Sequence, residues 1–171
     1  MASWSDFTTS TPWLAKRISD LFHQYGPGLG YLATVRADGG PRVHPVSPVL
    51  AEGGLYCFVM DSPKRRDLER DGRYALHAYP PEHSDDEAYL TGQAEAVTEV
   101  NRIERIARVS RAEPRANWRL FEFDIEVALL TLHVGPARSP SYQVWHDPGR
   151  PVRTRRRGTA QPGGDATTRC A

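Results

Sequence analysis

Three cations stand at the start of a predicted helix, directly after the most apolar run of the sequence. Residues 55–60 have the length and composition of a buried strand. Ser62 can cap the helix that follows, and Pro63 suits its first turn because proline has no N–H to lose there. The cations come next and are Lys64, Arg65 and Arg66. The helix dipole disfavours each of them by a few tenths to ~1 kcal/mol, a cost expected where another group compensates.

A bound anion is the natural compensating group. The free N–H groups at a helix start bind phosphate, and Ser62 and the three cations would surround it. Lys64 strengthens this interpretation, because the chain holds twenty arginines and only one other lysine, Lys16. The cluster therefore predicts a phosphate-binding site at the start of this helix.

A purely structural explanation fits the same residues. Arg65 and Glu69 are four positions apart, so they could pair on a solvent-exposed helix face. Asp61 could in turn offset the helix dipole. Both explanations stay open on these residues alone.

The charge distribution gives no basis for a nucleic-acid-binding domain. The 171 residues carry a formal net charge of +1, but six arginines and one aspartate lie from Gly149 onward. The remainder carries 16 basic and 20 acidic residues, a net charge of −4. Cys57 and Cys170 form no paired motif, and no apolar run approaches the ~20 residues of a membrane span. We therefore expect a soluble, cytoplasmic, single-domain protein without membrane partners.

The elements that must position the basic cluster are mostly strands. A helix is predicted from Pro12 to the Gly-Pro-Gly at 26–28, and residues 31–36 and 42–50 predict a hairpin. Pro45 and Pro48 cannot donate to a strand ladder, so part of the second strand must lie on an edge or beside a gap. His44, in this strand, is the histidine that we place near a ligand, although a surface position suits it equally well.

The second half of the chain continues this pattern. Strands are predicted over 74–79, 88–100 and 121–134, and a helix over 102–111 with Asn101 and Glu104 as a capping pair. Gly92 weakens its strand or marks a bulge, and an inverted apolar phase after Leu129 predicts a second bulge or a barrel corner. Six to seven strands with a few short helices indicate a mainly β (α+β) antiparallel barrel. We expect a loose segment over 1–12, one domain over 13–147 and a disordered Arg-rich tail over 148–171.

Other chemistries find little support. The six histidines lack metal-ligand spacing, so no metal site is predicted. Neither Ser47 nor Ser62 has an evident base nearby, which leaves nucleophilic catalysis unsupported.

Three stretches of the sequence together resemble a known protein family. They are LATVRADGGPRVHPVSPV, LYCFVMDSPKRRDLERDGRYALHA and AYLTGQAEAV. In order and spacing they closely resemble the pyridoxamine 5′-phosphate oxidase-like superfamily of FMN-binding split barrels, over roughly residues 29–100. The resemblance implies a six- to seven-stranded antiparallel split barrel and a homodimer with two flavin sites between its subunits.

The resemblance also implies the cofactor site. Ser62 and Lys64 would hold the phosphate of FMN, and Arg65 and Arg66 would assist. The backbone along the second strand would line the flavin ring, and Met60 would lie in the same site. The residues of that second strand are His44, Pro45 and Val46. The function implied is an oxidoreductase that transfers hydride or electrons through the flavin to a small-molecule substrate.

The end of the chain departs from the resemblance. Pyridoxamine phosphate oxidases end in an arginine-leucine-x-proline motif that helps to bind substrate, and this chain ends in an Arg-rich tail without it. Vitamin oxidation is therefore not expected. Two alternatives remain, a deazaflavin-dependent reductase and a non-catalytic protein that binds or senses flavin or haem.

Overall fold

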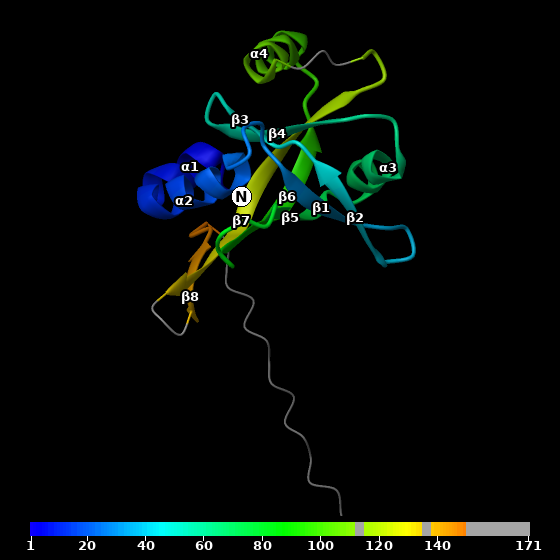
Figure 1. Cartoon of the computed structure of the whole chain (residues 1–171). Coiled ribbons are helices and arrows are strands. Elements are labelled where there is room, and N and C mark those ends of the chain that lie inside the picture. The colour runs from blue at the N-terminus through cyan, green and yellow to red at the C-terminus, as the bar shows by residue number, and fades with distance from the viewer. Residues whose placement is uncertain (112–114, 135–137, 150–171) are drawn as a thin grey trace, which may run out of the picture.

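The computed structural model describes residues 1–111, 115–134 and 138–149, which form one antiparallel sheet curled into an open barrel with helices around it (Figure 1). The order along the sheet is β2-β1-β5-β6-β7-β4-β3, and β8 pairs with β7. The strands are β1 (Gly30–Val35), β2 (Pro41–Val46), β3 (Val49–Ala51), β4 (Gly54–Val59), β5 (Arg73–Ala78), β6 (Glu87–Ala96), β7 (Arg119–Val134) and β8 (Ser139–His146). The helices are α1 (Trp4–Ser10), α2 (Pro12–His23), α3 (Pro63–Arg70) and α4 (Val100–Ser110). The predicted mainly β split barrel is confirmed.

The described residues contain eight strands, one more than the upper prediction. Two differences account for the count: the predicted strand over 42–50 is divided into β2 and β3, and β8 is added. The sequence of β8, SPSYQVWH, shows little apolar alternation. It buries only Trp145 among its eight residues, because it lies at the side of the sheet and is held by backbone pairing along β7. Hydrophobic periodicity cannot detect such a strand. The predicted Arg-rich tail lies outside the described residues from residue 150 onward.

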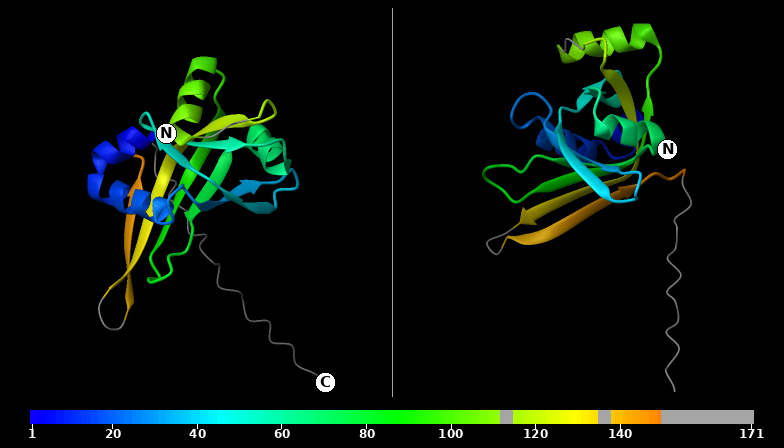
Figure 2. Two further views of the ribbon diagram at one scale, coloured as in Figure 1. Left: turned by 45° about the horizontal axis from the view of Figure 1, so that its top comes forward. Right: turned by 90° about the vertical axis from the view of Figure 1, so that its right-hand side faces the viewer.

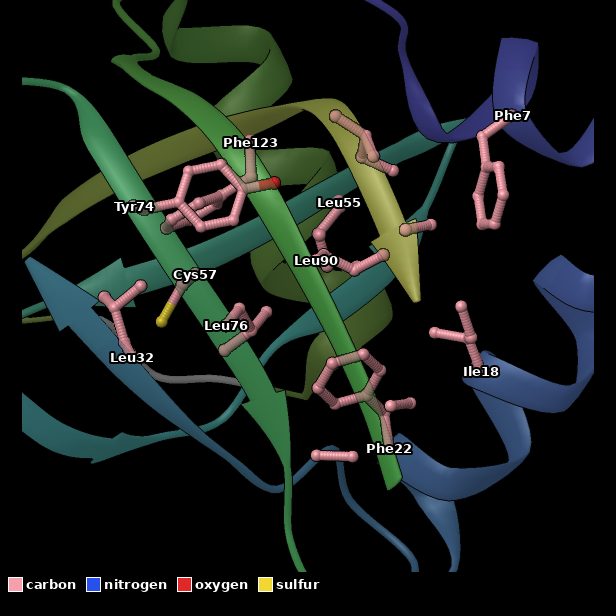
Figure 3. Close-up of a cluster of buried hydrophobic side chains, with 14 of the residues drawn as sticks. Phe7, Ile18, Phe22, Leu32, Leu55, Cys57, Tyr74, Leu76, Leu90 and Phe123 are labelled. Carbon is pink, nitrogen blue, oxygen red and sulfur yellow. The ribbon is translucent and has the colours of Figure 1, made fainter. Parts of the chain in front are cut away.

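The segment predicted to be loose is folded, so that prediction is wrong. Ser3 and Asp6 form a capping box at the start of α1, and the Phe7 side chain is fully buried. The Phe7 ring lies 4.9 Å from the Trp145 ring, centroid to centroid. Figure 3 shows Phe7 of α1 and Ile18 and Phe22 of α2, all pointing toward the strands. The two N-terminal helices therefore belong to the main hydrophobic core.

The predicted proline-bearing strand is divided between two edges. β2 ends at Val46, and β3 begins at Val49, so Pro48 lies between them. These two short strands are the two ends of the sheet order. The edge position predicted from the prolines is thus confirmed, and the interruption at Pro48 carries the chain from one end of the sheet to the other.

The bulge predicted at Gly92 is confirmed. The β6–β7 pairing shifts by one residue between Thr91 and Gly92, which leaves Glu126 as the extra residue of β7. A Cβ on Gly92 would lie 1.9 Å from the Asp124 carbonyl oxygen, so only glycine fits.

The phase change predicted after Leu129 belongs to this same bulge, three residues earlier. Ile125 and Ala128 are both buried on either side of it. Val127 and Leu129 are apolar but only half-buried. Because they continue the apolar alternation of the residues before the bulge, the sequence alone places the bulge too late.

The remaining helices lie at other parts of the barrel. In Figures 1 and 2, α4 lies apart from α1 and α2, and α3 lies beside the β1–β2 hairpin. The capping pair predicted for α4 is wrong, because the helix begins one residue before Asn101 and its N-cap, Glu99, makes no side-chain cap bond. No helix within the described ranges combines the length and hydropathy needed to span a bilayer.

Candidate functional site

The basic cluster lies where it was predicted, at the junction between β4 and α3. Ser62 is the N-cap of α3, but its hydroxyl donates to the Met60 carbonyl at 3.0 Å and does not cap the helix. The Ser62 carbonyl accepts from the backbone N–H groups of Arg65 and Arg66 at 3.1 and 3.3 Å. The helix start is therefore ordered by its own backbone, and the Ser62 hydroxyl would have to turn away from Met60 before it could donate to a phosphate.

The three cations point to different places. Lys64 lines a cavity beside β2, and the structure records no ion pair for its ammonium among the described residues. Arg65 donates to Glu69 at 2.9 Å and to the Asn117 carbonyl at 3.0 Å. Arg66 lies 3.5 Å from Asp61 on the opposite side of the helix start. The pairing of Arg65 with Glu69 is the one that the structural explanation predicted, so Lys64 remains the strongest candidate anion ligand.

The cavity at Lys64 has mainly apolar walls and a volume of about 250 Å³. Of the predicted site residues it unites Pro45, Val46, Met60 and Lys64. The other lining residues are Ser47, Val49, Phe58, Ser110 and Trp118. Sequence reasoning missed Ser110 and Trp118, because Ser110 ends α4 and Trp118 directly precedes β7, far from the recognisable motif.

His44 lies on the edge strand between Arg42 and Val46, which alternation places on the same face of β2. Its side chain is half-buried, and its Nε2 atom is buried without a hydrogen-bond partner in the described structure. Burial, and then the charges of Lys64 and Arg42, lower the pKa of His44. The imidazole is therefore neutral at pH 7 and offers an unused nitrogen next to the Lys64 charge.

A buried carboxylate organises the other side of α3. Asp67 is 4% exposed and accepts hydrogen bonds from Arg42 Nε at 2.7 Å, Thr34 Oγ1 at 3.0 Å and Arg70 Nη1 at 3.3 Å. Burial alone would raise the pKa of Asp67, but the three hydrogen bonds hold it below its ordinary value. Sequence reasoning missed Asp67, because only Arg70 among its partners is near it in the chain.

A second hollow opens beside this carboxylate, and we call it the arginine groove. Its volume is about 470 Å³. Its lining residues are Arg36, Ala37, Asp38, Arg42, Pro63, Arg66, Asp67 and Arg70. Pro63 lines the groove, and the next residue of α3, Lys64, lines the cavity.

The site offers no activated nucleophile. Cys57 is buried in the core (Figure 3), and burial raises the pKa of its thiol to about 12, although the nearby Lys64 charge acts in the opposite direction. Within the described ranges no group of three histidine, cysteine or acidic side chains could hold a metal ion. The chemistry available to the site is binding of an anionic, partly apolar ligand.

An open antiparallel barrel, with Lys64 lining an apolar cavity beside β2, defines a split-barrel class of protein. The family model described as pyridoxamine 5′-phosphate oxidase matches residues 15–132, well over half of the sequence. The chain belongs to this family, and the resemblance noted in the sequence is confirmed.

Solved structures share the fold at low sequence identity. PhzG from Burkholderia lata 383, in complex with tetrahydrophenazine-1-carboxylic acid, has a TM-score of 0.58 and 15% identity, covering 84% of this chain and 87% of its own. General Stress Protein 26 from Bacillus anthracis str. Sterne has a TM-score of 0.55 and 17% identity, covering 75% and 95%. The heme binding protein from Mycobacterium smegmatis has a TM-score of 0.55 and 17% identity, covering 74% and 57%. No curated protein matched the sequence.

Proposed function

We propose that this protein is an FMN-binding oxidoreductase whose flavin phosphate is held by Lys64. The observation that carries the proposal is the combination of an ammonium without an ion-pair partner among the described residues and an apolar cavity directly beside it. A ligand with a phosphate at one end and a planar aromatic ring at the other satisfies both features.

The residues present fit FMN in three respects. Lys64 can bind phosphate at the start of α3, and the Ser62 hydroxyl can donate to the phosphate if it turns away from the Met60 carbonyl. Val46, Met60 and Trp118 provide apolar walls for a ring system. The buried Nε2 of His44 lacks a partner in the described structure, and a polar ligand atom would supply one.

The division of labour follows from this fit. Bound FMN would supply the hydride or electron transfer. The chain would anchor the phosphate through Lys64, present the unpaired edge of β2 to the ligand, and exclude water with the apolar walls around Met60 and Trp118. The acid–base chemistry needed from the chain itself is small, in keeping with the neutral His44 and the protonated Cys57.

The proposal includes a homodimer with a small-molecule substrate. The Lys64 cavity, at about 250 Å³, is smaller than the ~300–1,000 Å³ typical of ligand pockets, so a second chain would complete its walls. Beside it, β2 presents an apolar outer face in which Val43 is 60% exposed and Pro41 and Pro45 are exposed. Sedimentation analysis should give a particle with the mass of two chains, and Val43→Asp should shift it toward one.

Flavin titration tests the proposal. The purified protein should show a flavin absorption spectrum, or quench FMN fluorescence with saturation at micromolar concentration. The holoprotein should also turn over a reduced nicotinamide in the presence of an electron acceptor. Failure to bind any flavin would overturn the proposal, whereas binding without turnover would reduce it to flavin storage or sensing.

Haem binding is a second candidate, and His44 favours it. A neutral imidazole with an unpartnered Nε2 beside an apolar cavity is a suitable axial ligand for haem iron. Haem titration of the parent and of His44→Ala tests this candidate. A Soret band that shifts or disappears in the variant would support it, and identical spectra would exclude His44 as the ligand.

A further inference from the structure

A further cavity lies between α3, α4 and the start of β7, and we call it the α4 cavity. Its volume of about 530 Å³ is more than twice that of the Lys64 cavity, and it falls within the ~300–1,000 Å³ typical of ligand sites. The apolar part of its wall consists of Phe58, Val97, Ile103, Trp118 and Leu120. The proposed binding of FMN at Lys64 leaves this volume without a role.

The rest of the wall is basic. Arg65 comes from the first turn of α3, Arg119 is the first residue of β7, and Arg115 lies four positions before it. Among the described residues no aspartate or glutamate lines the cavity. Guanidinium groups bind oxyanions through charge-assisted hydrogen bonds, and the apolar wall suits a ring. The cavity therefore fits a small aromatic anion.

The three arginines share one carboxylate. The Arg65 side chain is 18% exposed and donates to Glu69 at 2.9 Å and to the Asn117 carbonyl at 3.0 Å. Glu69 also lies 3.5 Å from Arg119, but both side chains are well exposed, so this contact is weak. Arg115 has no ion pair within the described ranges. Three positive charges and one negative charge leave a net charge of +2 beside the cavity.

The α4 cavity and the Lys64 cavity have a common wall. Phe58 and Trp118 line both of them. Lys64 lines only the smaller cavity, and the three arginines line only the larger one. Each cavity thus has its own source of positive charge, so substitutions can address the two separately.

We infer that the α4 cavity is a second ligand site, which binds an aromatic carboxylate or an aryl phosphate. The oxyanion would bind Arg115 and Arg119, and the ring would pack against Trp118. Arg65, already fixed by Glu69 and Asn117, would add its charge to the site. The inference goes beyond the proposed function, because this ligand would be bound together with FMN and not in its place.

Calorimetric titration of the full-chain apoprotein with benzoate, phenyl phosphate and neutral benzyl alcohol tests the inference. The anions should bind ~10- to 100-fold more tightly than the alcohol, as expected for a charge-assisted contact. The tighter of the two anions shows whether the site prefers a carboxylate or a phosphate. Arg115→Gln and Arg119→Gln should each weaken anion binding about tenfold, with the melting temperature of the apoprotein unchanged, because both arginines are exposed.

Two variants serve as controls. Arg105 is also an exposed arginine paired with a carboxylate, Glu52 at 2.9 Å, and it lies on α4 but does not line the cavity. Arg105→Gln should therefore bind the anions as the parent does. Lys64→Ala should also keep their affinity, within about twofold, while it loses affinity for FMN.

The outcomes separate this inference from the proposed function. If FMN displaces the anions, or Lys64→Ala weakens them as much as Arg119→Gln does, they occupy the Lys64 cavity and the inference is overturned. Equal binding of charged and neutral probes, or no binding of either anion at millimolar concentration, also overturns it. If the anions bind as expected but no flavin does, the proposed function fails and the second site stands.

Discussion

The two ends of the barrel bury different kinds of side chain. At the α1–α2 end, Phe7, Ile18 and Phe22 are almost completely buried among other apolar side chains (Figure 3). At the α3 end, burial encloses polar groups such as Asp67 and Thr34. The first end contributes stability through apolar area removed from water. The second holds charges in fixed positions, and each of these requires a partner.

At the α3 end, the buried polar groups differ in whether they have hydrogen-bond partners. Asp67 has three hydrogen-bond donors, whereas the neighbouring Nε2 of His44 has no partner among the described residues. Satisfied buried polar groups maintain a structure, and an unsatisfied one is open to a hydrogen bond from a water or a ligand. The comparison therefore separates residues that stabilise the apoprotein from residues that we propose to bind the cofactor, and mutations should separate them too.

The largest effect is expected at the apolar end. Phe7→Ala should lower the free energy of unfolding by about 3–5 kcal/mol, because it leaves a cavity beside Trp145. Urea unfolding measures this change. Trp13→Ala is the control, since Trp13 is 56% exposed and its removal should cost little. Equal stability of Phe7→Ala and the parent would show that the N-terminal helices are not part of the core.

The sequence predicted the core of this end only in part. The apolar stripe of α2 was readable because twelve residues show a clear helical period. A seven-residue helix such as α1 buries a single side chain, Phe7, and has no period to detect. The capping box at Ser3 and Asp6 was the one local signal that could have identified it.

Lys64→Ala should have the next largest effect, on ligand binding alone. Loss of a charge-assisted hydrogen bond to phosphate should weaken FMN binding ~10- to 100-fold. The melting temperature of the apoprotein should stay the same or rise slightly, because a cation leaves the start of α3. Calorimetric titration and apoprotein melting on the same variant measure both.

Arg65→Ala is the matched comparison. Arg65 is paired with Glu69 and Asn117, so its loss should lower stability and affect FMN binding less than the loss of Lys64. If Lys64→Ala binds FMN as well as the parent does, the assignment of the phosphate site is wrong.

The position of the basic cluster at a strand–helix junction was predictable, but the arrangement of the candidate site was not. The strand–Ser–Pro–Lys junction is local in sequence, so Lys64 was singled out from residue type and order, whereas Met60 entered only through the family resemblance. The partners of Asp67 at Thr34 and Arg42 lie 33 and 25 residues away and meet it only through the β1–β2 register. The separation of Arg65 from Arg66 depends on how α3 packs, which no local pattern specifies.

Asp67→Asn should destabilise the apoprotein by about 1–3 kcal/mol, because Arg42 and Arg70 lose their shared carboxylate. The pKa of Asp67 is lowered in the folded state, so its contribution is present above the unfolded value of about 3.9 and is lost as pH falls through the folded value. The stability difference between parent and variant should therefore be large at pH 7 and narrow below about pH 4. A difference that is independent of pH would show that packing, and not charge, is what Asp67 contributes.

The smallest effect on apoprotein stability is expected from His44. It comes from a charge that the folded state disfavours, whereas Asp67 carries a charge that the folded state favours. Burial and the neighbouring cations lower the pKa of His44 in the folded apoprotein, so the unfolded chain takes up a proton first as pH falls through about 6.5. Apoprotein stability should therefore decrease between pH 7 and 5 by less than about 1 kcal/mol on this account, because partial exposure screens the charges. His44→Gln should remove this part of the decrease. Saturation with FMN should also reduce the acid-induced loss of stability in the parent, because a phosphate at Lys64 offsets the cations that disfavour protonation of His44. A loss of stability that FMN leaves unchanged would place the phosphate away from His44.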